Sequence, residues 1–489
     1  MRIRGAVVGL LVALGLPAPP AAADSPVVRT DAGLVRGVAT DGLRQFEGIP
    51  FAAPPVGALR WRAPRAVTPW HGVRDATEPG SQCAQLAPAY GGSTTYVEDC
   101  LYLNVTAPNR RGQRPVLVWL HGGSNLTGAG SGYDASKLAA DGDVVVVTVN
   151  YRLGVFGWLG DGNHGLLDQQ AALRWVQRNA RAFGGDPRNV TLFGESAGAA
   201  DTCAQLASPA AAGLFHKAGP QSYSCTAPAR TVPAATAEAT RLRQAVGCAS
   251  DACLRDVPAR TLLEQFAAIG GQPGPVAGTP LLPRPPAEAL ATGRFHHMPI
   301  LHGNTRDEMR LYVGLAYPTE LTAAQYTAIV TAMFPDRAAE VLARYPAGPA
   351  PRLALAAIQS DHGTALSACT HLQAYTLLAD AGVPVYAYQF ADRDAPPLID
   401  LPDFDEGAEH ATELTYLWPG LLGTLTPAQE ALSDTMVAYW TSFAHKGKPS
   451  APHAPRWPRF HSPDDVLNLA PGEVAPVDIG ERSNCAFWG

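Results

Sequence analysis

Charged residues are sparse in this 489-residue chain, and none of its segments is strongly basic. They make up 16% of the sequence, and the formal net charge is −6. The basic runs are short pairs such as Arg110–Arg111, which is too little for a surface that binds a phosphate backbone. The chain also lacks a G-x-x-x-x-G-K-[ST] phosphate loop and any zinc-like C-x-x-C spacing. We therefore expect no nucleic-acid partner, no metal and no organic cofactor.

Hydrophobic runs long enough to span a membrane are also missing. The longest apolar stretch, residues 5–16, is shorter than the roughly 20 residues that a spanning helix needs. Arg2 and Arg4 precede this stretch, and Ala21–Ala23 follows it as an A-x-A cleavage site. This order is typical of a secretory signal peptide. We predict a signal peptide over residues 1–23, a secreted protein and no stable membrane anchor.

Cysteine is present in an even number, and an even number in an exported chain favours disulfide bonds. Buried free thiols are the alternative for some of them. The eight cysteines are Cys83, Cys100, Cys203, Cys225, Cys248, Cys253, Cys369 and Cys485.

Three continuous apolar runs, 115–121, 143–150 and 189–194, are rich in residues that favour strands. Runs of this kind suit a parallel sheet that helices cover on both faces. A helical pattern over 166–183 separates the second run from the third, and Asp186–Pro187 marks a turn after it. Strand–helix–strand alternation predicts an α/β fold with a large, mostly parallel central sheet. We expect residues 24–489 to form one domain of this kind.

The later part of the chain continues the same alternation. Strands are expected at 297–302 and 384–390, and a helix is expected from Pro427 up to Gly447, with Thr426 as its N-cap. Two segments, 224–280 and 391–409, are rich in proline, glycine and charge. We interpret them as surface excursions around the mouth of an active site.

The strongest chemical motif is the G-x-S-x-G of Gly194–Gly198, centred on Ser196. It follows an apolar strand and precedes a good helix-forming segment, which is the context that a nucleophile needs on a tight strand-to-helix turn. The start of a helix also favours developing negative charge. We therefore predict that Ser196 is a catalytic nucleophile.

A glycine-rich turn, His121–Ser124, follows the first apolar strand. Such a turn lets backbone N–H groups point at a substrate oxygen. We assign the oxyanion hole to the backbone N–H groups of Gly123, Ser124 and Ala197. A plain tight turn is the alternative for Gly122–Gly123.

A serine nucleophile needs a histidine base and a carboxylate that orients it, in the order Ser, Asp or Glu, His. Periodicity does not choose among the histidines, but the chain resembles the type-B carboxylesterase and cholinesterase family of the α/β-hydrolase superfamily nearly from end to end. The segments that carry the resemblance are EGIPFAAPPVGALRW at 47–61, EDCLYLNV at 98–105, NYRLG at 150–154, GNHGLLDQQAALRW at 162–175 and FGGDP at 183–187.

The resemblance implies which residues complete the triad. The family's acid lies in a short Asp-Glu turn after a strand, which here makes Glu308 the acid and leaves Asp307 as a second candidate. The family's histidine precedes an apolar, aromatic stretch, which makes His410 the base. Glu195 and Glu413 match acidic positions near the triad and are expected to support it electrostatically. Helix capping by Asp307–Glu308 and a surface position for His410 are the structural alternatives.

The resemblance also implies disulfide pairs. Cys83–Cys100 and Cys248–Cys253 would close two loops, and Cys369–Cys485 would tie the C-terminus to the body. Cys203 and Cys225 remain and would pair with each other.

The chain departs from the family at several positions near the expected site. Ser124–Asn125 stands where a glycine or alanine and an aromatic residue are common. Pro220 removes a ladder donor from an expected strand, and Tyr223 replaces a glycine. A reshaped pocket and a weakened strand are the two alternatives for these changes. No tryptophan lies between Cys83 and Cys100, so the choline-binding tryptophan is missing and cholinesterase activity is not expected.

These features together predict a secreted serine carboxylesterase that acts on small-molecule carboxylic esters. A lipase, an amidase or a hydrolase of bulky or polymeric esters could use the same triad. A catalytically silent binding protein is the alternative from a different class, and the presence of Ser196, Glu308 and His410 together argues against it.

Overall fold

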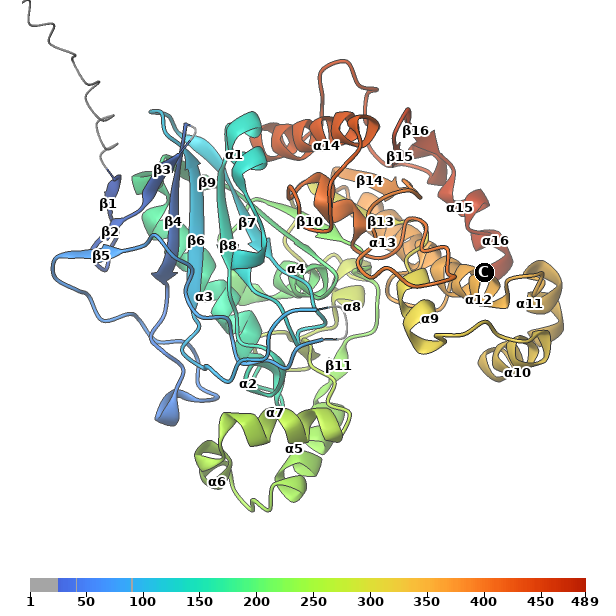
Figure 1. Cartoon of the computed structure of the whole chain (residues 1–489), viewed down its shortest axis with the longest axis horizontal. Helices are drawn as coiled ribbons and strands as arrows, with labels where there is room; N and C mark the ends of the chain where they lie inside the picture. Colours follow the sequence, from blue (N-terminus) through green and yellow to red (C-terminus); the bar gives the residue numbers. More distant parts are fainter. Residues whose placement is uncertain (1–24, 41, 89–90) are drawn as a thin grey trace, which may run out of the picture.

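The computed structural model describes residues 25–40, 42–88 and 91–489. The signal peptide predicted over 1–23 lies outside these described residues. A twisted eleven-stranded sheet in the order β16-β15-β14-β13-β10-β9-β7-β8-β6-β4-β3 runs through the molecule (Figure 1). Its strands are β3 (Val38–Thr40), β4 (Leu43–Pro50), β6 (Tyr102–Pro108), β7 (Arg114–Leu120), β8 (Val145–Val149), β9 (Gly185–Glu195), β10 (Lys217–Gln221), β13 (Ile300–Thr305), β14 (Val385–Phe390), β15 (Val466–Ala470) and β16 (Glu473–Val477).

The middle of this sheet is parallel. Neighbours from β8 across to β15 pair in parallel, whereas β15–β16, β8–β6, β6–β4 and β4–β3 pair antiparallel. Two small sheets lie outside it. They consist of β1 (Val27–Arg29), β2 (Leu34–Arg36) and β5 (Val73–Asp75), and of β11 (Arg230–Thr231) with β12 (Val276–Ala277).

Helices cover both faces of the sheet, as expected for an α/β-hydrolase fold. They are α1 (Ser136–Gly142), α2 (Gly154–Trp158), α3 (His164–Asn179), α4 (Ala197–Ala207), α5 (Val232–Ala245), α6 (Asp251–Asp256), α7 (Ala259–Ala268), α8 (Pro286–Ala291), α9 (Arg310–Ala316), α10 (Ala323–Met333), α11 (Ala338–Arg344), α12 (Pro351–Asp361), α13 (Ala368–Asp380), α14 (Pro427–Lys446), α15 (Ile479–Arg482) and α16 (Cys485–Trp488). Short 3-10 turns are η1 (Gly57–Leu59), η2 (Gly130–Gly132), η3 (Ala180–Phe183), η4 (Pro209–Ala211), η5 (Thr412–Tyr416) and η6 (Pro463–Asp465).

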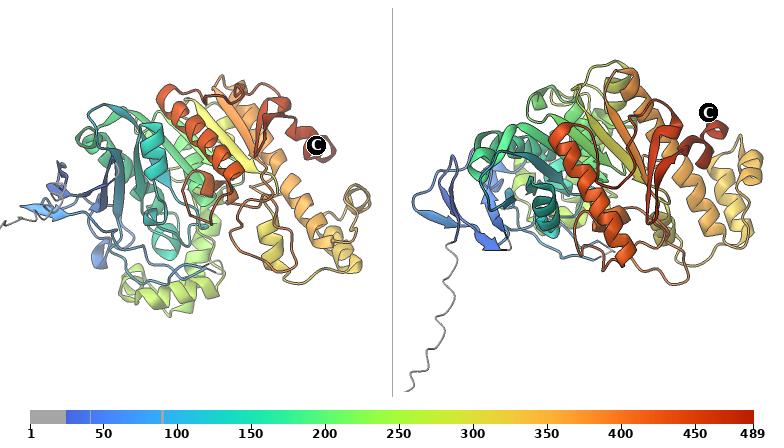
Figure 2. Two further views of the ribbon diagram at one scale, coloured as in Figure 1. Left: turned by 45° about the horizontal axis from the view of Figure 1, so that its top comes forward. Right: turned by 90° about the horizontal axis from the view of Figure 1, so that it is seen from above.

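Strand β7 shows why the central strands are apolar throughout. Val116 and Val118 belong to a core that includes residues of α3, α4 and α13, whereas Leu117 and Trp119 belong to a core that includes residues of α1 and α14. Successive side chains of a strand point to opposite faces, so a strand covered on both sides must be apolar at every position. Figure 2 shows α14 lying across one face, in front of the yellow strand β13 in its left panel.

Most predicted elements are present with small shifts in their bounds. The helix with Thr426 as N-cap and Gly447 as C-cap forms as expected. The strand expected at 297–302 begins only at Ile300, because β13 pairs with β14 from that residue onward. The turn expected at Asp186–Pro187 is not a strand boundary. Both residues lie within β9, where the pairing with β7 shifts register before Val190.

The two proline- and glycine-rich segments leave the sheet and lie near the expected site. Residues 224–280 contain β11, α5, α6, α7 and β12, and the three helices bulge from the lower edge in Figure 1. Residues 391–409 contain no helix or strand. Both segments contribute side chains to cavities that reach Ser196.

Four disulfides join the cysteines in the pairs that the resemblance implies. They are Cys83–Cys100, Cys203–Cys225, Cys248–Cys253 and Cys369–Cys485. Across the described part of the chain, no helix is both long and apolar enough to cross a membrane.

Candidate active site

Ser196 occupies a sharp turn between β9 and α4. Its φ of 54° and ψ of −118° lie in a strained region for a residue with a side chain. A Cβ on Gly194 would come within 2.6 Å of the Gly198 backbone, and one on Gly198 would come within 2.0 Å of the Leu120 carbonyl oxygen. Glycine at both positions lets strand, helix and β7 approach closely enough to form this turn.

The neighbouring strand also holds the turn. The Ser196 backbone N–H donates to the Gln221 carbonyl oxygen at the end of β10, with a distance of 2.9 Å. Pro220 stands one residue earlier, yet β10 forms and pairs with β9 there. Pairing with β13 is confined to Ala218 and Gln221. The strand therefore forms despite the proline, while its pairing with β13 is interrupted at Gly219 and Pro220.

His410 and Glu308 form a buried pair. Nδ1 of His410 lies 2.6 Å from Oε2 of Glu308, which comes from the turn after β13. The other oxygen of Glu308 accepts the backbone N–H of Thr305 at 2.8 Å. Both side chains are almost inaccessible to solvent. A carboxylate held in this way fixes the tautomer and orientation of the imidazole ring.

Asp307, the second candidate for the acid, has other partners. Its carboxylate pairs with Arg310 at 3.3 Å and Arg393 at 3.2 Å, and accepts the backbone N–H of Ala408 at 3.1 Å. Glu308, and not Asp307, is therefore the carboxylate that is hydrogen-bonded to His410.

The other ring nitrogen of His410 faces a second carboxylate. Nε2 lies 3.1 Å from Oε1 of Glu195, without the alignment of a hydrogen bond. Ser196 and His410 line the same cavity, but no hydrogen bond joins them among the described residues. Catalytic hydrogen bonds of unliganded enzymes often tighten only when substrate binds.

Three carboxylates control the charge on His410. Burial alone would lower the pKa of its imidazole, but Glu195, Glu308 and Glu413 outweigh burial and raise this pKa to about 9. Burial in turn raises the pKa of the Glu195 carboxyl, and it raises that of Glu413 well above the usual range. Glu195 and Glu413 thus both act on the pKa of the His410 imidazole.

Three backbone N–H groups near Ser196 have no acceptor among the described residues. They belong to Gly123, Ser124 and Ala197, the positions expected for an oxyanion hole. The loop packs tightly on the turn, since a Cβ on Gly122 would lie 3.2 Å from the Ser196 Cβ. Unpaired donors this close to a nucleophile can stabilise an oxyanion.

A buried carboxylate that sequence reasoning missed lies behind this loop. Asp201 on α4 accepts hydrogen bonds from Asn125 Nδ2 at 3.3 Å and from Gln169 Nε2 at 2.6 Å. Burial raises its pKa to about 7. The available signal was its position five residues after Ser196, on a helix that is otherwise apolar or small at its start. Tyr312, whose ring lies 5.4 Å from that of His410, carried no signal in the sequence.

Two cavities meet at Ser196. The larger, about 530 Å³, is lined by Ala197, Tyr223 and the Cys203–Cys225 disulfide. The smaller, about 270 Å³, contains His410 and Glu195 and is lined by several leucines. Tyr223, at a position where the resemblance leads us to expect glycine, is thus one of the side chains of the larger cavity. In the described part of the chain, no group of three or more His, Cys, Asp or Glu side chains could hold a metal ion.

Comparisons with known proteins cover almost the whole chain. The model of the carboxylesterase family matches residues 24–488. The para-nitrobenzyl esterase of Bacillus subtilis is 37% identical over 89% of this chain and 92% of its own length. Carboxylesterase 3 of Pongo abelii is 35% identical over 95% of this chain and 90% of its own. The crystal structure of a Geobacillus stearothermophilus carboxylesterase superposes with a TM-score of 0.82, at 35% identity, over 94% of this chain and 99% of that one.

Proposed function

Because the chain belongs to the carboxylesterase family, we propose that it hydrolyses carboxylic esters through a covalent acyl-enzyme on Ser196. Family membership confirms the resemblance, the α/β-hydrolase fold and the expected class, a carboxylic ester hydrolase. The observation that carries the proposed mechanism is that Ser196, on a strained turn, lines the same cavity as His410, whose ring is paired with Glu308.

In the proposed reaction His410 takes the proton of Ser196 while the hydroxyl oxygen attacks the ester carbonyl. The carbonyl oxygen becomes an oxyanion, and the N–H groups of Gly123, Ser124 and Ala197 stabilise it. His410 then gives its proton to the leaving alcohol. Water, activated by the same imidazole, attacks the acyl-enzyme and releases the acid. Glu308 orients the imidazole and stabilises its charged form in both halves.

The two cavities receive the two parts of the ester. His410 must reach the leaving alcohol to protonate it, and His410 lines only the smaller cavity. The alcohol therefore binds there, among leucines. The acyl group extends to the other side of the scissile carbonyl, into the larger cavity that Ala197 and Tyr223 line.

We also propose that the protein is exported. The signal-like segment over residues 1–23 supports this. Four disulfides support it as well, because such bonds persist mainly in oxidising surroundings outside the cytosol.

Hydrolysis of p-nitrophenyl esters of increasing acyl length tests the proposed activity. We expect the wild-type protein to hydrolyse short and medium esters, and Ser196→Ala and His410→Ala each to reduce kcat by about 10⁴-fold or more. Glu308→Gln should also lower kcat, with the ring of His410 misoriented. Equal turnover by wild type and Ser196→Ala, with both folded, would rule out the serine mechanism.

A further inference from the structure

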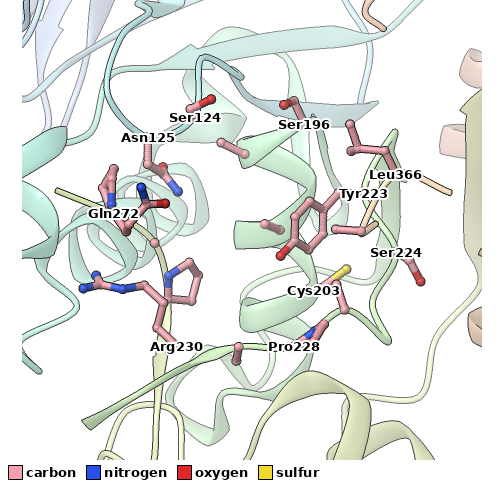
Figure 3. Close-up of a pocket in the computed structure, with 18 of the residues that line it drawn as sticks. Ser124, Asn125, Ser196, Cys203, Tyr223, Ser224, Pro228, Arg230, Gln272 and Leu366 are labelled. Carbon is pink, nitrogen blue, oxygen red and sulfur yellow. The ribbon is translucent and has the colours of Figure 1, made fainter. Parts of the chain in front are cut away.

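The larger cavity has walls that are mainly apolar. The Cys203–Cys225 disulfide, Pro228 and Leu366 form part of them. Figure 3 shows Ser196 and Ser124 at the top of the view, with Tyr223 and Gln272 on opposite sides of the same cavity. An apolar cavity with a few convergent polar groups is the usual form of a site that recognises one feature of a small molecule.

Tyr223 is the most informative of these polar groups. Its ring is largely buried, and its hydroxyl makes no hydrogen bond to any residue that the structure describes, although it lines the cavity. Burial raises the pKa of this hydroxyl to about 12, and so it remains neutral at physiological pH. The hydroxyl is therefore open to the cavity, where a polar group of a ligand can replace water as its hydrogen-bond partner.

Gln272 and Ser124 add two more such groups. The backbone N–H of Gln272 donates to Glu238 Oε2 at 2.6 Å, which holds the residue at the cavity wall. Its side-chain amide makes no hydrogen bond to a described residue, and neither does the hydroxyl of Ser124. An amide and two hydroxyls can both donate and accept, so they suit an oxygen-bearing group of either kind.

The positive charge of Arg230 at this cavity is balanced by a neighbouring carboxylate. Arg230 lines it, but its guanidinium pairs with the buried Glu238 carboxylate at 2.7 Å and also donates to the Trp158 carbonyl oxygen at 3.3 Å. An anionic acyl group would therefore have to compete with Glu238. The cavity fits a neutral group better than a carboxylate.

We propose that this cavity selects neutral acyl groups bearing a hydroxyl, ether or carbonyl oxygen, and that Tyr223 is the residue that recognises this oxygen. The proposal rests on the proposed esterase function and on the assignment of the acyl group to the larger cavity. The proposal also accounts for the tyrosine at a position where the resemblance leads us to expect glycine, because glycine has no side chain that could bind this oxygen.

Matched pairs of methyl esters test the proposal, since the leaving alcohol is then the same. Each pair compares a hydroxyl with a methyl group of similar size, as in 4-hydroxycinnamate against 4-methylcinnamate and 6-hydroxyhexanoate against heptanoate. The kcat/KM values are followed by titration of the released acid. We expect the wild-type protein to favour the hydroxyl member of at least one pair by about tenfold, whereas an apolar cavity would favour the methyl member.

Two variants and one control test whether Tyr223 and Gln272 cause the preference for the hydroxyl member. Tyr223→Phe should lower the hydroxyl-to-methyl ratio by about tenfold, and Gln272→Met, at an exposed position, should lower it by a smaller factor. Tyr96→Phe, outside both cavities, should keep the wild-type ratio. A wild-type preference for the methyl member of every pair, or an unchanged ratio in Tyr223→Phe, would overturn the proposal. Neither outcome resembles failure of the esterase function, in which Ser196→Ala would hydrolyse these esters as well as wild type does.

Discussion

The side-chain amide of Asn125 donates a hydrogen bond to the carboxylate of Asp201 at 3.3 Å, and this bond joins the two halves of the proposed oxyanion hole. Asn125 follows Gly123 and Ser124 in the loop, whereas Asp201 lies on α4, which begins at Ala197. Ser124 and Asn125 both have φ near 56°, a conformation that needs support from its surroundings. Asp201 is therefore in a position to hold the loop against the helix.

Replacement of Asp201 tests this role. Asp201→Ala removes the acceptor, so we expect kcat to fall by about tenfold or more while KM changes little, because the oxyanion donors act mainly in the transition state. Asp201→Asn should retain most activity. The buried Oδ1 of Asn125 has no partner, and the amide can rotate to accept a hydrogen bond from the new side chain. Equal kcat in wild type and Asp201→Ala would show that the loop does not depend on this bond.

Asp201 should also make the stability of the folded protein depend on pH. Burial raises the pKa of Asp201 from 3.8 to about 7, so the folded protein keeps a proton that the unfolded chain releases. Its contribution to stability therefore falls as pH rises from about 4 to about 7. Asp201→Asn should raise the free energy of unfolding by roughly 2 kcal/mol or more at pH near 8, and by less than about 1 kcal/mol at pH near 4. Urea titrations at both pH values measure this, and an equal change at both would contradict the pKa assignment.

The negative charge of Glu195 should influence the pH at which kcat/KM begins to rise, which is the acidic limb of the pH–rate profile. His410 must be neutral to act as a base, and the surrounding carboxylates raise its pKa to about 9, so kcat/KM should rise with pH toward the alkaline range. Glu195→Gln removes one of these charges and should shift the limb to lower pH by about one unit. The surface substitution Glu430→Gln serves as the control. A limb that stays in place in Glu195→Gln would mean that Glu195 does not control the charge on His410.

Loss of the C-terminal disulfide should destabilise the protein more than loss of the disulfide that closes a short loop. Cys369–Cys485 spans 116 residues of sequence, and Cys248–Cys253 spans 5. Closing the longer loop restricts the unfolded chain more, so replacing both Cys369 and Cys485 by serine should cost about 3–4 kcal/mol. The same change at Cys248 and Cys253 should cost about half as much or less. Thermal unfolding of the two double variants compares them directly, and equal losses would contradict the loop-length argument.

Much of the fold could be predicted from local sequence. A strand buried on both faces must be apolar throughout, which made the cores of β7, β8 and β9 recognisable, and the Thr426–Pro427 and Gly447 signals marked both ends of α14. The start of β13 was harder to predict. It depends on where β14 offers hydrogen-bond partners, which is a property of the neighbouring strand.

Some features of the site could likewise be predicted from local sequence, and others could not. The G-x-S-x-G turn is local, since its glycines are required by contacts within one strand–helix turn and with β7. The choice of Glu308 over Asp307 needed a resemblance, because adjacent carboxylates differ only in the direction in which the fold points them. The pairing of Asn125 with Asp201 joins residues 76 positions apart, and neither residue carries a local signal of it.

The acyl-enzyme on Ser196 is the central claim, and one measurement tests it most directly. Wild type and Ser196→Ala are mixed with p-nitrophenyl acetate, quenched in acid within the first turnovers and digested for mass spectrometry. We expect a burst of p-nitrophenol in the wild type and one acetyl group on the peptide that contains Ser196, with neither in the variant. A wild-type protein that turns over the ester without a burst and without acetylated Ser196, or a variant that still forms the adduct elsewhere and hydrolyses the ester at the wild-type rate, would contradict the account.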